Sequence, residues 1–268
     1  MDDKELEALL GPSPKSSKQS RKQSENEKNK SLATIIAMAI VTFILWDGTL
    51  LDRICQGLGV LSYIIYPLKI FTVFLHELSH GLAAMITGGK IVSITLDAQQ
   101  GGLCTYMSSK NWFASAFTAS AGYLGSMLWG CLFLIAAIKT GKGKSFNTAI
   151  GIMVLIVTIL WVRDIFPLAF CLLFGLAMLF TGSKLSEDFN SFLLKYIGTV
   201  SCLYSLFDIP DDLIFRTVQG SDSHAIASSI GMPFLSVPIG ILWMAMALAC
   251  FYFSYKIAMG EDDSPDED

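Results

Sequence analysis

Charged residues are scarce in this chain of 268 residues. Lysine, arginine, aspartate and glutamate together make up 16% of the sequence, whereas about 25% is usual in a soluble domain. Hydrophobic residues account for 53%, and the mean hydropathy is +0.54. This composition excludes an ordinary soluble domain. We therefore expect a multi-pass integral membrane protein whose solvent is the lipid bilayer, and we expect no nucleic-acid partner.

Closely spaced cysteine pairs are also missing. Six cysteines are present and none forms a CxxC pair, which argues against thiol redox chemistry. Four of them, Cys131, Cys171, Cys202 and Cys250, lie inside apolar segments, where cysteine behaves as a small hydrophobic residue.

The charges that are present are concentrated at the two ends of the chain. Basic residues from Lys15 to Lys30 precede the first apolar segment, and an acidic run from Glu261 closes the chain. We expect residues 1–30 and 259–268 to be disordered tails around a membrane domain at 31–258. The first thirty residues lack the features of a secretory signal, so the first apolar segment is expected to be a retained anchor. Basic residues before this anchor predict a cytoplasmic amino terminus, in a membrane that the sequence does not identify.

Apolar segments recur along the whole domain, and about 20 residues are needed to cross the hydrocarbon. Arg163-Asp164 with Pro167 marks either a turn between two short spans or a kink in one long helix. The fold class is therefore an all-α polytopic membrane protein with six or seven transmembrane helices. The segments lie near residues 32–51, 60–86, 112–138, 147–162, 165–181, 190–207 and 234–258.

Two of the chain's three histidines fall within the pentapeptide His76-Glu77-Leu78-Ser79-His80, at the end of an apolar stretch. Positions i and i+4 share one face of a helix, so both imidazoles can bind one metal ion, while Glu77 projects about 100° from His76. Two ligands and a general base within one turn are typical of zinc hydrolases. Ionisable groups at membrane depth are costly unless paired, ligated or hydrated. The motif thus predicts a membrane-embedded metal site. If the segment 60–86 crosses the membrane completely, His76 and His80 lie nearer the side of the membrane on which the amino terminus lies.

The stretch after this helix has the period of a strand. Val92, Ile94 and Leu96 alternate with polar residues, and a turn containing Gly101 and Gly102 leads into residues 103–107. We expect a small β-hairpin at the surface or lining a cavity, because open sheet edges are not tolerated against lipid.

A catalytic zinc ion needs a third protein ligand and a free position for water. The apolar run from Phe192 ends in three carboxylates, Asp208, Asp211 and Asp212. Asp208 is nearest the apolar run and is the expected ligand, with Asp211 and Asp212 as alternative ligands, as residues that orient a ligand, or simply as helix caps. His224, within Ser221-Asp222-Ser223-His224, is a rival nitrogen ligand that we expect to be solvated.

The motif with its surroundings, from Phe74 to Ala84, resembles the active-site helix of the site-2 protease family of intramembrane zinc metallopeptidases, with Ser79 where glycine is common. The hairpin and the later acidic segment correspond in order, so the resemblance covers about residues 60–215. Asp208 is followed by Ile209 where the family usually has glycine, and no PDZ domain fits. A compact branch of the same family, which has Asp-Ile-x-Asp-Asp in this later acidic segment, resembles the chain more closely.

The resemblance and the chemistry both imply hydrolysis of peptide bonds in membrane-embedded or membrane-proximal substrates, with one Zn²⁺ per chain. His76, His80 and Asp208 would hold the ion, and Glu77 would act as general base. A substrate transmembrane helix must unwind before attack. One hairpin strand would hold the unwound segment by strand addition, with Val92, Ile94, Gly101 and Gly102 as candidate contacts.

Two other classes of function fit the same sequence. A non-catalytic scaffold, or pseudoprotease, would keep the helices and make Glu77 dispensable. An ion- or proton-coupled transporter would use the histidines and acids as a path across the membrane, although the sequence has no internal repeat. The oligomeric state is left open by the sequence.

Overall fold

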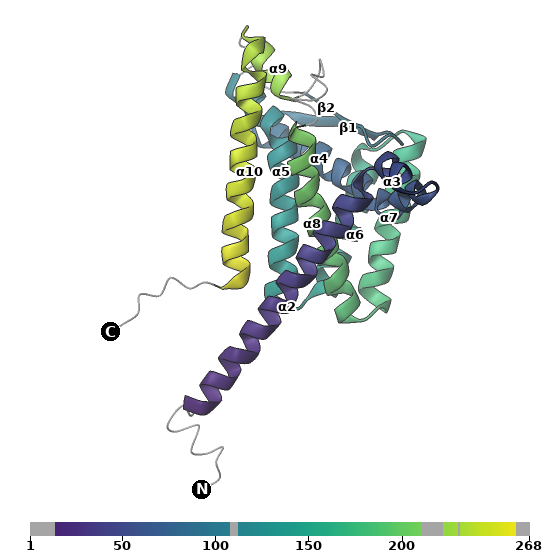
Figure 1. The fold of residues 1–268 in the computed structure, drawn as a ribbon. Coiled ribbons are helices and arrows are strands. Elements are labelled where there is room, and N and C mark those ends of the chain that lie inside the picture. The colour runs from purple at the N-terminus through teal and green to yellow at the C-terminus, as the bar shows by residue number, and fades with distance from the viewer. Residues whose placement is uncertain (1–13, 108–111, 211–221, 230, 261–268) are drawn as a thin grey trace, which may run out of the picture.

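The fold is a bundle of long helices with a two-stranded hairpin at one end (Figure 1). The structure is a computed structural model that describes residues 14–107, 112–210, 222–229 and 231–260. The helices are α2 (Pro14–Trp46), α3 (Gly48–Ile54), η1 (Leu58–Ile64), α4 (Tyr66–Ile86), α5 (Trp112–Lys139), α6 (Gly143–Trp161), α7 (Ile165–Lys184), α8 (Glu187–Pro210), α9 (Asp222–Ser229), η3 (Pro233–Leu235) and α10 (Ser236–Met259), and the strands are β1 (Lys90–Leu96) and β2 (Gly102–Met107).

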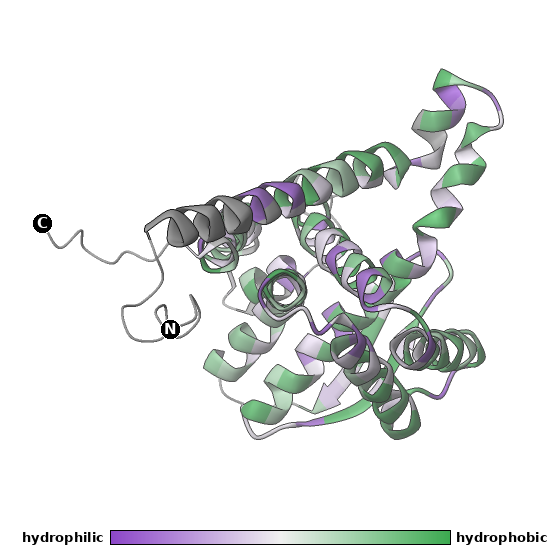
Figure 2. Cartoon of the chain, turned by 90° about the horizontal axis from the view of Figure 1, so that it is seen from below, coloured by the Kyte–Doolittle hydropathy of each residue, from purple (hydrophilic) through white to green (hydrophobic). Residues whose placement is uncertain are grey.

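Six of the described helices are long and apolar enough to cross a membrane: α2 from Lys28, α5, α6, α7, α8 and α10. Hydrophobic residues predominate along the bundle (Figure 2). Many of them are exposed, including Ile159 and Leu173, each at 70%. Outward-facing apolar side chains are expected where the surrounding solvent is lipid. The predicted all-α polytopic membrane fold is confirmed.

Helices α5 and α8 form the centre of the bundle and run antiparallel. The hydroxyl of Ser205 donates to the carbonyl of Tyr123 at 2.8 Å, and that of Ser201 donates to the carbonyl of Ser126 at 2.8 Å. Farther along, a Cβ on Gly130 would lie 2.8 Å from the carbonyl oxygen of Gly198. Small residues let the two backbones approach, as in other membrane helix pairs.

Helix α2 runs parallel to α8. Lys195 of α8 donates to the hydroxyl of Ser31 at 3.1 Å, and the ring of Trp46 at the end of α2 packs edge-on against Phe207, with centroids 4.9 Å apart. The end of α2 and the start of α5 therefore lie at the same end of the bundle, which we call the hairpin end. At the opposite, terminal end, a Cβ on Gly260 would lie 3.2 Å from Nζ of Lys28, so α10 ends beside the start of the α2 span.

Helix α4 enters and leaves the bundle at the hairpin end. With the short helix η1 it forms a pair bent by 47°. The end of α2, which precedes this pair, and the start of α5, which follows it, both lie at the hairpin end. The count among the described residues is thus six spans and one re-entrant segment. This arrangement contradicts the expectation that α4 returns toward the amino-terminal side. A hydropathy pattern does not distinguish a helix surrounded by protein from one surrounded by lipid.

The region around Arg163 contains a turn between two spans. Helix α6 ends at Trp161 and α7 begins at Ile165. The two helices pack antiparallel, because a Cβ on Gly151 would meet the carbonyl oxygen of Gly175 and one on Gly182 would meet Thr148. The two-span interpretation of residues 147–181 is therefore the one that the structure adopts.

The first long helix is longer than the sequence indicated. Helix α2 begins at Pro14 and so includes most of the basic segment that we expected to be a tail. Lysine, glutamine and glutamate have good helix propensity, and the apolar half of α2 supplies the nucleus from which a helix propagates. Residues 1–13 and the acidic run 261–268 lie outside the described residues.

The predicted β-hairpin is confirmed. Strand β1 pairs antiparallel with β2, Ile94 opposite Cys104, with an irregularity between Ile91 and Ser93 that leaves Val92 outside the register. In the turn, Oδ1 of Asp97 accepts the backbone N–H groups of Gln99 and Gly101, each at 2.8 Å. The outer edge of β1 is bridged to Val162 at Ile94.

Candidate metal centre and adjacent carboxylate

The predicted motif lies in the most enclosed part of the molecule. Pro67 occupies the first turn of α4, where its missing N–H costs nothing, and Gly88 follows the helix end with φ 86°, a conformation that glycine adopts without strain. Protein covers α4, so the exposed fractions of His76, Glu77 and His80 are only 7%, 7% and 5%. Polar groups buried to this degree need partners.

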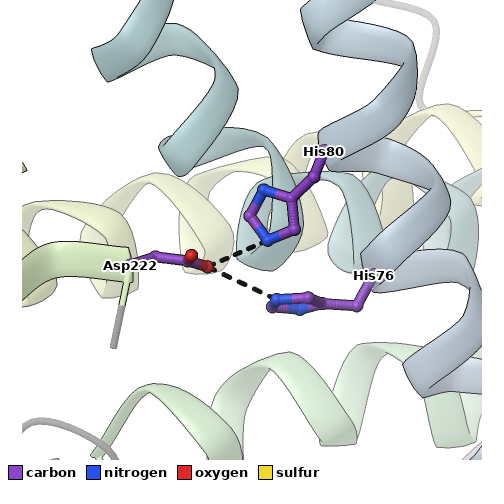
Figure 3. Close-up of side chains that lie close together, drawn as sticks. All are labelled: His76, His80 and Asp222. Carbon is purple, nitrogen blue, oxygen red and sulfur yellow. Dashed lines mark ion pairs between the residues drawn. The ribbon is translucent and has the colours of Figure 1, made fainter. Parts of the chain in front are cut away.

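The partner of the two histidines is Asp222, the first residue of α9. Its Oδ2 lies 3.4 Å from Nε2 of His76 and 3.1 Å from Nε2 of His80. Figure 3 shows the carboxylate pointing between the two imidazoles from the opposite side. One ligand atom from each of the three residues lies within 4.8 Å of the others, and the described residues contain no second group of this kind.

The neighbouring helix α5 sets the orientation of both imidazoles. Nδ1 of His80 lies 2.7 Å from the carbonyl oxygen of Thr118. A carbonyl only accepts, so Nδ1 carries the proton and the lone pair of Nε2 is left for a ligand. His76 packs edge-on against Tyr123, with centroids 4.9 Å apart. A Cβ on Gly122 would clash with Nε2 of both histidines, so glycine at this position allows both rings to lie against the α5 backbone.

The charge of Asp222 complements the site. Burial opposes ionisation of its carboxyl, but His80 and His76 in their protonated form, through charge and hydrogen bonds, hold its pKa below the usual value; a bound cation would take the place of the two Nε2 protons. An ionised carboxylate and two imidazole nitrogens are a donor set that suits zinc. The convergence of the two Nε2 atoms and Oδ2 of Asp222 within 4.8 Å fits an ion held by all three residues.

Glu77 lies beside the group of three without belonging to it. Its Oε2 accepts the backbone N–H of Cys104, in β2, at 2.7 Å. A Cβ on Gly102 would lie 2.7 Å from Cγ and Oε1 of Glu77, so glycine at the start of β2 makes room for this carboxylate. Burial, with a smaller effect from the charge of Glu77, raises the pKa of the Cys104 thiol to about 12, which keeps that thiol neutral. The hairpin therefore fixes the carboxylate next to the metal ligands.

Comparison with known families agrees with this geometry. The family described as Peptidase M50B-like matches residues 35–254, a range that includes α4, the hairpin and Asp222. The chain belongs to the Peptidase M50B-like family. No curated protein and no solved structure gives a significant match. The match to the family model confirms the resemblance to site-2 proteases, and the chain is a multi-pass membrane protein of a metallopeptidase family.

Within this M50B-like fold, the structure brings together some of the predicted site residues and not others. His76 and His80 meet as expected, with Glu77 next to them. Asp208 is not in the group: α8 presents Tyr204 to His76, with ring centroids 6.3 Å apart, and Asp208 lies one turn farther along α8, which continues to Pro210. Asp211 and Asp212 lie outside the described residues. His224, in α9, is also not a member of the group.

Asp222 was missed by the sequence analysis. It lies in the polar segment from which only His224 was considered, and such a segment has no apolar periodicity to indicate burial. The signal that was available is Ile226, which packs with Ala119 and Tyr123 of α5 and holds α9 over the metal motif. An acidic residue one helical turn before a buried isoleucine is a weak signal by itself.

The candidate strand contacts differ in accessibility. Ile94 is fully buried, and Val92, at 50% exposure, lies in the strand irregularity. Gly101 belongs to the turn, and Gly102 faces Glu77. Of these four residues, Gly102 is the one nearest the metal motif.

Proposed function

We propose that this M50B-like protein is an intramembrane zinc metallopeptidase that hydrolyses peptide bonds of membrane protein substrates. The observation that carries the proposal is the convergence of two Nε2 atoms and one carboxylate oxygen within 4.8 Å, next to a buried glutamate held by a strand. Residues 31–258 would form the catalytic domain, and the surrounding lipid would deliver the substrate.

His76, His80 and Asp222 would hold the ion. Zn²⁺ bound by three protein ligands lowers the pKa of a water molecule in its fourth position toward about 7. Thr118 would keep His80 in the ligating tautomer, and Gly122 would allow both imidazoles to lie against the α5 backbone.

Glu77 would act as the general base. Its carboxylate takes a proton from the attacking water and passes it to the leaving amine, a role that contributes about 10²- to 10⁴-fold to rate. The hydrogen bond from Cys104 keeps one carboxylate oxygen occupied, which leaves Oε1 for the proton.

Strand β2 is the better candidate for holding the substrate. The outer edge of β1 is already bridged to Val162 at Ile94, whereas the N–H of Cys104 points away from β1 toward Glu77. The Cys104 N–H is taken by Glu77, so an unwound substrate segment lying along β2 would pair with the backbone groups on either side of Cys104, and its scissile amide would lie beside Glu77.

The test is metal content and peptide cleavage by purified protein in lipid nanodiscs, with membrane-inserted peptides as substrates. Wild-type protein should hold about one zinc ion per chain and cleave. Glu77→Gln should keep the zinc and lose cleavage by at least about 10²-fold. Asp188→Asn, an exposed carboxylate at the terminal end, is the matched control and should change neither.

Full cleavage by Glu77→Gln would contradict the proposal. Zinc without cleavage in the wild type would favour the pseudoprotease. Ion flux across proteoliposomes that depends on His76 would favour the transporter.

A further inference from the structure

Helix α10 ends beside α2 at the terminal end of the bundle. Gly260 follows the last residue of α10 in the left-handed conformation, with φ 62°. A Cβ on Gly260 would lie 3.2 Å from Nζ of Lys28, so the ammonium of Lys28 lies at the carboxyl-terminal end of α10, where the helix dipole is negative. The chain after Gly260 therefore starts directly next to α2.

The two segments that meet there have opposite charges. Residues 261–268 contain six acidic residues and no basic one. Helix α2 begins at Pro14, and from there to Lys30 it has two acidic residues, Glu25 and Glu27, and six basic residues, Lys15, Lys18, Arg21, Lys22, Lys28 and Lys30. We call residues 14–30 the basic turns of α2. Because the fold holds the two segments together at Lys28, each acts on the other at a high effective concentration.

The acidic segment is long enough to follow the basic turns. Eight residues in an extended conformation span about 26 Å, and α2 rises about 20 Å from Lys15 to Lys28. Counted from Gly260, residue 264 reaches about 13 Å along α2, which corresponds to about nine residues of helix. In this register Ser264 lies near Ser20.

The position of the basic turns favours the acidic segment over anionic lipid as their partner. Helix α2 continues as one helix past the end of α10 (Figure 1), and its membrane-crossing part begins at Lys28. Lys15 therefore lies about 20 Å farther out along the helix. Salt screens charges beyond about 8 Å at physiological ionic strength. Lipid headgroups thus act mainly on Lys28 and Lys30, and the outer basic residues are left to the acidic segment.

We propose that residues 261–268 bind along the basic turns of α2 and so link α10 to α2. These two helices have the smallest buried fractions among the six candidate spans, 17% and 11%, so a link between their ends restrains helices that packing holds weakly. Single pairs of exposed charges contribute little, and the contact depends on several pairs that form together. Peptidase activity is not needed for this contact, so its test is independent of the proposed function.

The experiment measures cross-linking in the full-length protein, in phosphatidylcholine nanodiscs that hold one chain each. Ser20→Cys and Ser264→Cys are joined by a short bismaleimide, and the linked peptide is quantified by mass spectrometry, which distinguishes it from products of the native cysteines. Ser183→Cys with Ser264→Cys is the control pair, because Ser183 is exposed at the same end. The 20–264 yield should exceed the control yield about tenfold at low salt and fall about tenfold in 1 M salt, where the Debye length is about 3 Å.

Charge reversal tests whether the charges cause the contact. Lys18→Glu with Lys22→Glu should lower the 20–264 yield about tenfold, because two attractive pairs become repulsive. Adding Asp263→Lys with Asp266→Lys to the same chain should restore the yield.

Three results would overturn the proposal. The first is a 20–264 yield equal to that of the control pair, or one that salt and charge reversal leave unchanged. The second is an equal loss of yield in Lys139→Glu with Lys142→Glu, two exposed lysines at the same end, because the cause would then be the overall charge of that end. The third is loss of the yield when phosphatidylserine is added to the nanodiscs, which would assign the basic turns to anionic lipid.

Discussion

Helices α4 and α7 have nearly the same length, 21 and 20 residues, and both are largely apolar, yet they lie in different surroundings. In α7 only 28% of the most apolar window is buried, and Leu173 and Phe180 are exposed at 70% and 58%. Helix α4 is covered by protein and contains a lysine, a glutamate and two histidines, all buried.

The difference shows what allows ionisable groups inside a membrane protein. In α4 each such group has a partner from another element: Trp46 for Lys69, Cys104 for Glu77, and Asp222 for both histidines. Helix α7 faces lipid, where an ionisable side chain would find no partner. Its only charged residue is Lys184, the last residue of the helix. Burial in protein, not hydropathy, makes α4 the location of the chemistry.

The largest expected effect concerns the re-entrant path of α4. If α4 does not cross the membrane, residues before and after it are accessible to reagents from the same side. Cys55, before α4, and a cysteine introduced by Thr105→Cys, after it, are both exposed and should react with a membrane-impermeant maleimide from the same side. Ser183→Cys, at the terminal end, should react from the opposite side. Reaction of Cys55 and the residue-105 cysteine from opposite sides would make α4 a full span and contradict the fold.

The same labelling tests the orientation in the membrane. Lys28, Lys30, Lys139, Lys142 and Lys144 belong to the terminal end, and basic loops face the cytoplasm. The terminal end with the amino terminus is therefore predicted to be cytoplasmic, and the metal group is predicted to lie nearer the other side. Labelling of Ser183→Cys from outside the cell would reverse this assignment.

A methyl group added at the metal group should have a large effect on zinc affinity, and one added at the contact between α6 and α7 should have little. Gly122→Ala places its Cβ against both Nε2 atoms, and we expect zinc affinity to fall about 10- to 100-fold. Gly175→Ala is the control, because its Cβ would meet Leu155 at 2.8 Å and the carbonyl oxygen of Gly151 at 3.3 Å, and none of the metal ligands. Competition with a chelator measures both affinities. Unchanged zinc affinity in Gly122→Ala would place the ion elsewhere.

Displacing the Glu77 carboxylate should have a smaller effect, on cleavage alone, and should leave zinc binding unchanged. Gly102→Ala would displace Glu77 from β2, and we expect cleavage to fall about tenfold or more while zinc content stays constant. Asp188→Asn, an exposed position at the terminal end, should cleave normally. If Gly102→Ala lost zinc instead, Glu77 would be acting as a ligand.

Local patterns made part of this site predictable. The spacing of His76 and His80 determines that they share a face, and strand alternation determines that a hairpin follows. Asp222 was not predictable in the same way, because its approach depends on how α9 packs over α5 through Ile226, a contact between segments far apart in the sequence. The choice of Asp208 relied on its nearness to an apolar run, which indicates membrane depth but not the direction of a side chain.

The most direct test of the metal group compares Asp222→Ala with Asp208→Ala by zinc content after dialysis of purified protein in nanodiscs. The geometry predicts that Asp208→Ala keeps about one zinc ion per chain, like the wild type, because a ligand set of two histidines and Asp222 remains. Asp222→Ala should lose most of its zinc. Zinc retained by Asp222→Ala but lost by Asp208→Ala would contradict the assignment of the third ligand and return it to α8.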